Sequence, residues 1–191
     1  MSALPKEEHY FTYAEYKEWE LKEGERFEII FGEAYAMSAP NTRHQEILGA
    51  VYNQLYNYLD GKPCKVYPAP FDIRLFYKDD ESDDTVVQPD ISVICDEKKR
   101  GVEGCRGAPD LVIEILSPSN TAIEMERKRQ LYQNAGVREY WVIDPENKVF
   151  IVYNFQSGGP FPVYYYYKSK DIVPVAIFPD LNINLERVFA E

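Results

Sequence analysis

Glu114 interrupts an apolar run, Leu-Val-Ile-Glu-Ile-Leu, that covers residues 111–116. A continuous run of this kind predicts a buried strand that is covered on both faces. A carboxylate buried there without a partner costs several kcal/mol or takes up a proton. We therefore expect another part of the fold to place a compensating group, most simply a cation, against Glu114.

Two further ionisable residues could meet Glu114. Asp90 follows Pro89 at the entry of an apolar segment, so it should lie near a strand start, from which it could reach a neighbouring strand. Lys128 lies on the apolar stripe of a predicted helix, where a lysine either extends to solvent or meets an acid. Taken alone, Asp90 could equally bind turn backbone. If both acids converge, they require a proton or a divalent cation between them.

The elements that must position these residues can be read from caps and periodicity. Thr42 and Gln45 have capping-box spacing and predict a helix to about residue 59, with an inward stripe that includes His44. Thr121 and Glu124 predict a second helix that ends at Gly136. A short helix is expected over residues 12–19.

Strands are predicted between and around these helices. Residues 27–31 and 34–37 form an expected N-terminal hairpin, and 149–155 and 163–168 a C-terminal one. Further strands are expected within 66–77, 86–95, 111–116 and 140–144. Strands interleaved with two long helices indicate an α/β or α+β fold around a central mixed sheet. With no internal repeat or linker, residues 1–191 are interpreted as one domain.

Composition narrows the class of protein. The chain has 191 residues, is 45% hydrophobic and carries a formal net charge of −11, which argues against unspecific binding of nucleic acid. The acidic segment 79–84 is interpreted as solvated. Three cysteines without a C-x-x-C pair predict neither a disulfide framework nor a structural zinc site. No secretory signal or membrane span is visible, so we expect a cytoplasmic protein.

Several segments together resemble the Uma-two family of endonucleases, which has the restriction-endonuclease-like PD-(D/E)xK fold. The resemblance extends from about residue 12 to 155. It rests on FEIIFGE at 27–33, His44-Gln45, VQPDISV at 87–93, APDLVIEILSPS at 108–119, Lys128-x-x-x-Tyr132 and GVREYWVIDP at 136–145.

The resemblance implies a Mg²⁺ or Mn²⁺ site at the edge of the sheet and hydrolysis of DNA phosphodiester bonds. Asp90 and Glu114 would be its acids and Lys128 its lysine, while the backbone carbonyl of Ile115 would be a further metal ligand. The superfamily usually has lysine two residues after the second acid, where this chain has Leu116. Here the lysine would come from the following helix.

Other assignments stay open. His44 could approach the phosphate or be a core histidine, and Glu28 and Glu33 could face the metal, although a surface or hairpin role is favoured for both. A homodimer is expected because many nucleases address two strands. The alternative is a non-catalytic interaction module in which Asp, Glu and Lys form a structural network. In that case the tyrosines at 164–167 could lie on an exposed strand or interface. RNA or nucleotide hydrolysis is a weaker third possibility.

Overall fold

A six-stranded mixed sheet forms the centre of the computed structural model, which describes residues 9–118, 120–157 and 163–190. β9 and β10 run parallel, and the other neighbouring pairs are antiparallel. The expected mixed sheet is therefore present. In spatial order its strands are β12 (Val163–Lys168), β11 (Val149–Asn154), β10 (Glu139–Asp144), β9 (Leu111–Ile115), β6 (Ile91–Ile94) and β3 (Lys65–Pro68).

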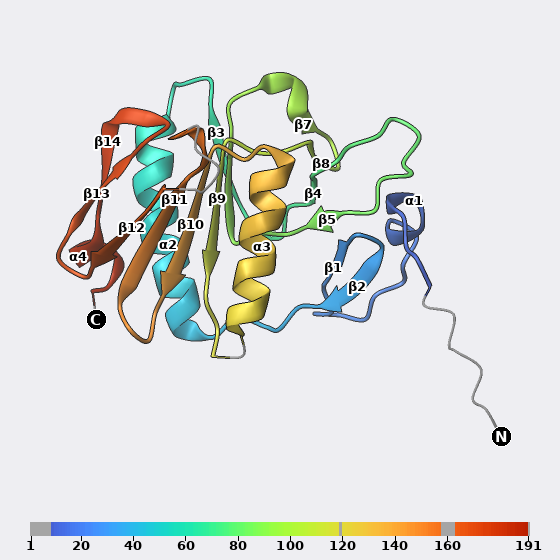
Figure 1. The fold of residues 1–191 in the computed structure, drawn as a ribbon, viewed down its shortest axis with the longest axis horizontal. Coiled ribbons are helices and arrows are strands. Elements are labelled where there is room, and N and C mark those ends of the chain that lie inside the picture. The colour runs from blue at the N-terminus through green and yellow to red at the C-terminus, as the bar shows by residue number, and fades with distance from the viewer. Residues whose placement is uncertain (1–8, 119, 158–162, 191) are drawn as a thin grey trace.

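Helices cover both faces of this central sheet (Figure 1). Because side chains alternate along a strand, Ile113 and Trp141 pack on one face and Val112 and Tyr140 on the other. The first face is covered by α2 (Thr42–Leu59), the hairpin of β13 (Ile172–Val175) and β14 (Phe178–Asn184), and α4 (Leu185–Val188). The second face is covered by α3 (Ala122–Ala135) and by residues of a second sheet.

The second sheet contains the predicted N-terminal hairpin. Its order is β2 (Glu33–Ala36), β1 (Phe27–Ile30), β5 (Val86–Val87), β4 (Ile73–Arg74), β8 (Gly104–Arg106) and β7 (Arg100–Gly101). The chain passes from β5 to β6, and so from one sheet to the other, through residues 88–90. Asp90 consequently lies where the two sheets meet. The remaining elements are α1 (Tyr13–Tyr16) and the 3₁₀ turns Glu97–Lys99 and Phe155–Ser157.

The two long helices begin close to where they were predicted. α3 has the expected capping box of Thr121 and Glu124, and it ends at Gly136, whose φ is +91°. For α2 the predicted cap was wrong, because the Asn41 side chain accepts from the backbone N–H of His44 and Thr42 is already helical. The buried stripe of α2 includes His44, as predicted, and consists of His44, Ile47, Val51, Leu55 and Leu59.

The prediction for the cysteines was wrong, since Cys64 and Cys95 form a disulfide. They flank β3 and β6, which pair antiparallel with Lys65 opposite Ile94, so the two cysteines come to lie side by side. Cys105 is free and buried.

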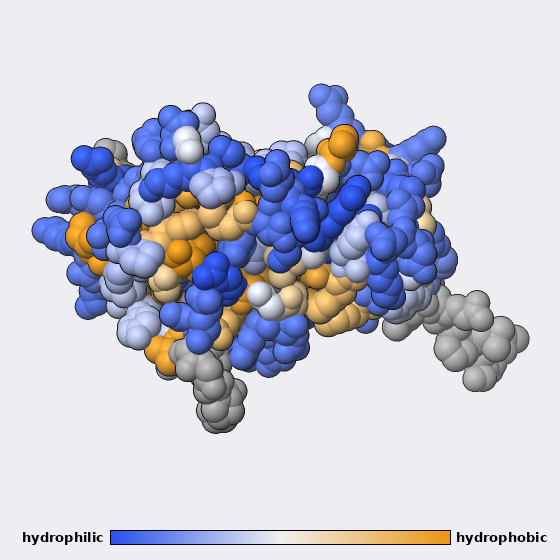
Figure 2. Space-filling model, turned by 90° about the horizontal axis from the view of Figure 1, so that it is seen from above, coloured by the Kyte–Doolittle hydropathy of each residue, from blue (hydrophilic) through white to orange (hydrophobic). Residues whose placement is uncertain are grey.

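The outer surface is largely polar. The face at the upper end of Figure 1 is mostly hydrophilic, with apolar residues reaching the surface in patches (Figure 2). At the sheet edge, Tyr164, Tyr165 and Tyr166 of β12 are exposed, as one of the sequence interpretations proposed. Over the described ranges, none of the helices combines the length and apolar character that crossing a bilayer requires.

Candidate functional site

Glu114 and Lys128 are in contact. Alternation along β9 directs Glu114, like Val112, toward α3, and Lys128 lies on the turn of α3 that faces it. Lys128 Nζ is 2.8 Å from Glu114 Oε1. The same oxygen accepts a hydrogen bond from the hydroxyl of Tyr132 at 2.6 Å, one helical turn further along α3. The compensating cation expected for Glu114 is therefore present, together with a second donor.

Glu28 belongs to the same group of charges, so the surface role favoured from the sequence was wrong. Its side chain comes from β1 in the second sheet, and the residue is only 4% exposed. Lys128 Nζ lies 3.1 Å from Glu28 Oε2, and the backbone N–H of Gln88 donates to Oε1 at 3.0 Å. Lys128 thus joins carboxylates from both sheets.

Asp90 is held beside Glu114 by the strand register. Ile91 pairs with Ile113, so Asp90, one residue before β6, lies next to the end of β9. Asp90 Oδ2 accepts from the backbone N–H of Ile115 at 2.7 Å and lies 3.1 Å from His44 Nε2. Ile115 thus contacts the site through its backbone N–H, which donates to Asp90. The sequence had predicted its carbonyl as a metal ligand.

His44 occupies the first turn of α2 and is buried, with 7% of its surface exposed. Its ring contacts Asp90 through Nε2, while the buried Nδ1 has no hydrogen-bond partner within the described part of the chain. Glu33, by contrast, lies outside this group. Its side chain is 64% exposed, accepts from the hydroxyl of Tyr35 and lies 3.7 Å from Arg127 Nη2.

Burial and the neighbouring charges shift the pKa values of the site residues. Burial raises the pKa of Glu114 to about 7; the Lys128 charge lowers it, and the Asp90 and Glu28 charges raise it further. Burial disfavours the Lys128 ammonium, but Glu114 and Glu28 outweigh this and raise its pKa above the ordinary value. Burial likewise raises the pKa of Tyr132 well above 10, so this phenol remains a donor. Lys128 is accordingly a stable cation at neutral pH.

These residues border a pocket of about 360 Å³. His44 and Asp90 line it together with Glu114, Lys128 and Glu28. It opens where the first turns of α2 and α3 approach the end of β9 and the β1–β2 hairpin, a region toward the lower end of Figure 1. This volume is within the range of small-molecule and substrate pockets.

Each of the two acids keeps one oxygen without a protein partner. Asp90 uses Oδ2 for both of its contacts and Glu114 uses Oε1 for both, so within the described residues Oδ1 and Oε2 make no hydrogen bond. No group of three or more His, Cys, Asp or Glu side chains in that part of the chain is arranged to hold a metal. Two carboxylate oxygens could nevertheless serve Mg²⁺, which commonly binds one or two carboxylates and keeps several waters.

Tyr132 was missed as a site residue. Tyr132 follows Lys128 by four residues, which places both side chains on one face of α3. This spacing could have identified Tyr132 from the sequence. For Glu28, the signal was a charge within the apolar segment 27–31.

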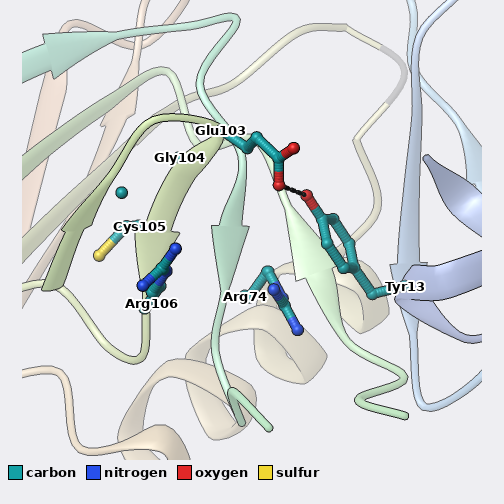
Figure 3. Close-up of a pocket in the computed structure, with 7 residues that line it drawn as sticks. Tyr13, Arg74, Glu103, Gly104, Cys105 and Arg106 are labelled. Carbon is teal, nitrogen blue, oxygen red and sulfur yellow. Dashed lines mark hydrogen bonds between the residues drawn. The ribbon is translucent and has the colours of Figure 1, made fainter. Parts of the chain in front are cut away.

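A second depression lies elsewhere, between α1 and the second sheet (Figure 3). Its volume is about 10 Å³, enough for about one water molecule. Tyr13 and Glu103 point toward one another across it and are hydrogen-bonded at 3.2 Å. Arg74 is already paired with Asp83, whose burial also corrects the interpretation of segment 79–84 as solvated throughout. The larger pocket is thus the better candidate for chemistry.

Known proteins of similar sequence or structure indicate the family and the fold of this chain. Residues 13–186 match the family Uma2, described as "Putative restriction endonuclease". The uncharacterized protein slr1290 of Synechocystis sp. (strain PCC 6803) is 28% identical over 156 residues, which are 81% of this chain and 80% of that protein. A crystal structure from Anabaena variabilis, described as "a putative nuclease belonging to DUF820", superposes with a TM-score of 0.72 at 22% identity, covering 94% of this chain and 98% of the other. The structural likeness shows that the two chains share one fold, a mixed α+β architecture with sheets flanked by helices.

Proposed function

Since the chain belongs to the Uma2 family, we propose that its pocket is the active site of a Mg²⁺- or Mn²⁺-dependent endonuclease that hydrolyses DNA phosphodiester bonds. The observation that carries the proposal is the arrangement of Asp90 and Glu114. The two acids line one pocket, and each engages one oxygen with protein donors and leaves the other for a ligand. When bound, the ion supplies Lewis acidity toward a phosphoryl oxygen and lowers the pKa of a water molecule.

The chain's own residues prepare this site. The Ile115 N–H and His44 fix Asp90, and Lys128 and Tyr132 fix Glu114, so neither acid needs to reorganise during the reaction. The raised pKa of Lys128 supports a role as a hydrogen-bond donor and positive charge near the phosphate. It argues against removal of a proton from water by Lys128, because the side chain is already protonated.

DNA as substrate and assembly into a homodimer belong to the same proposal. The family description supports a nucleic-acid substrate, and the three exposed tyrosines on the edge strand β12 offer a surface for a second copy. Aromatic residues are enriched in protein interfaces.

A cleavage assay tests the proposal. Purified protein is incubated with DNA and Mg²⁺ or Mn²⁺, and Glu114→Gln and Asp90→Asn are each expected to lower the rate by at least about 100-fold. Glu126→Gln is the matched control, because Glu126 lies on α3 but pairs with Arg129 outside the pocket. Cleavage that continues at the wild-type rate in Glu114→Gln would refute the proposal.

Calorimetry separates this proposal from the non-catalytic alternative. A nuclease should bind Mn²⁺, and Glu114→Gln should weaken that binding. If the wild type binds no Mn²⁺ and apolar replacement of Asp90, Glu114 and Lys128 increases stability, the charged group is a structural network.

A further inference from the structure

The wall of the pocket opposite Glu114 is formed by the N-terminal hairpin. Alternation along the extended segment that leads into β1 gives Arg26, Glu28 and Ile30 a common face, and all three line the pocket. Tyr35 of β2 lies opposite Glu28 in the register and lines the pocket beside them. The carboxylates therefore face a wall that carries a cation and an aromatic ring.

The cations around the pocket are not equally neutralised. Lys128 is paired with two carboxylates at 2.8 and 3.1 Å. Arg26 makes no hydrogen bond or ion pair through its side chain within residues 9–118, 120–157 and 163–190. The charge of Arg127 is partly neutralised, because its ion-pair partner Glu33 is 3.7 Å away and solvent-exposed. Arg26 is therefore available to an anionic ligand, whereas Arg127 is loosely paired with Glu33.

Arg127 also lies over the face of the Tyr35 ring. Its guanidinium carbon lies 4.3 Å from the centre of the Tyr35 ring, and both residues line the pocket. Aromatic rings and arginine planes are the groups on which unpaired nucleic-acid bases stack, whatever their sequence. The wall thus combines a base-stacking surface with cations that suit a phosphate.

We infer that this pocket binds one unpaired nucleotide next to the scissile phosphate, with its base against Tyr35 and Arg127 and its phosphate near Arg26. The inference rests on the proposed function and names its substrate as single-stranded DNA, or a single-stranded part of a DNA molecule. A base within a continuous duplex is stacked on its neighbours and does not enter a pocket unless it is extruded from the helix. The net charge of −11 also disfavours a long electrostatic track along a duplex.

Binding of one labelled oligonucleotide, free or annealed to its complement, tests the inference. Fluorescence anisotropy with Ca²⁺ in place of Mg²⁺ should give at least about tenfold tighter binding of the single strand. Arg26→Gln and Tyr35→Leu should each weaken single-strand binding about five- to tenfold and leave the weaker duplex binding unchanged. Tyr35→Phe retains the ring and should bind like the wild type, which separates stacking from an effect on the hairpin.

Two exposed residues provide matched controls outside the pocket. Arg187→Gln on α4 and Tyr56→Leu on α2 should leave single-strand binding unchanged. Equal or tighter binding of the duplex, or full single-strand binding by Arg26→Gln and Tyr35→Leu, would overturn the inference.

Cleavage of the same two oligonucleotides distinguishes the inference from the proposed function. Cleavage of the duplex alone that depends on Glu114 contradicts the single-strand inference and leaves the nuclease proposal intact. Single-strand binding that depends on Arg26, without cleavage in Mg²⁺ or Mn²⁺, supports the binding site and contradicts the nuclease proposal.

Discussion

The Tyr132 hydroxyl donates to Glu114 at 2.6 Å and shares the acceptor oxygen Oε1 with Lys128. Tyr132 is completely buried, so this contact is shielded from water. Two donors on one oxygen stabilise the ionised carboxylate and define which oxygen remains for a ligand. Tyr132 therefore positions Glu114 and is not itself placed to touch the substrate.

Tyr132→Phe should test this positioning role. The loss of a buried hydrogen bond to a charged group is expected to lower the free energy of unfolding by about 1.5–3 kcal/mol. Without the hydroxyl donor, the pKa of Glu114 should rise, and the increase of cleavage rate with pH should move to higher pH. Chemical denaturation and a rate profile against pH measure the two effects. A variant with reduced stability but an unchanged pH profile would contradict the positioning role.

Glu114 should make the metal-free protein less stable as the pH rises. The carboxyl has a pKa of about 7 in the folded state and 4.5 ordinarily, so between these values the unfolded chain releases a proton that the folded chain retains. Its contribution to the free energy of unfolding is thus fully present below 4.5 and is lost as the pH rises through about 7. The loss is at most about 3 kcal/mol.

Urea denaturation between about pH 5 and pH 8 measures this dependence. The free energy of unfolding should fall more steeply with pH in the wild type than in Glu114→Gln, where the titrating group is absent. The other titrating residues are common to both proteins, so their contributions cancel in the difference. Parallel curves would show that Glu114 keeps an ordinary pKa.

Lys128→Met should destabilise the fold because it leaves Glu28 and Glu114 without their cation. Removal of one partner from a buried ion pair typically costs about 3–5 kcal/mol. Adding Glu114→Gln to this variant should recover part of the loss, since one of the two stranded charges is then removed. The double-mutant cycle should give a coupling energy of about 1–3 kcal/mol. Additive effects of the two substitutions would argue against direct pairing.

Lys65→Met provides the control for this cycle. Lys65 is exposed on β3, away from the pocket, and its substitution should change stability by less than about 0.5 kcal/mol.

His44→Ala should reduce cleavage through Asp90. Without the ring, Asp90 retains only the Ile115 N–H, and we expect a loss of about tenfold in kcat with little change in KM. The chain contains one other histidine, His9, which is exposed and lies outside the pocket. His9→Ala is therefore the matched control. An equal loss in both variants would exclude a specific role for His44.

Local sequence signals predicted much of the site. A charge in a buried strand and a lysine on an apolar helix face each conflict with their surroundings, and the contact between Glu114 and Lys128 resolves both conflicts. Asp90, the acid after proline, is held instead by the Ile115 N–H and His44. The caps of α3 were predicted for the same reason, since Thr121, Glu124 and Gly136 act within a few residues of one another.

The remaining features depend on long-range pairing. Glu28 is buried because β1 pairs with β5, some 60 residues away, and the Cys64–Cys95 disulfide depends on the register between β3 and β6. Short-range patterns carry no information about these pairings. The β13–β14 hairpin was also not predicted, although it pairs neighbouring segments and its inward residues Val173 and Ile183 are fully buried.

The position of Glu28 on β1 has a consequence for the N-terminal segment. A shortened chain that lacks the hairpin would lose one of the two carboxylates that balance Lys128, and also the stacking wall. Packing of the hairpin against the central sheet thus supplies Glu28, the second carboxylate that balances Lys128. Displacement of β1 and β2 would move Glu28 away from Lys128. The Lys128 ammonium would transmit this change to Glu114, because it is paired with both carboxylates.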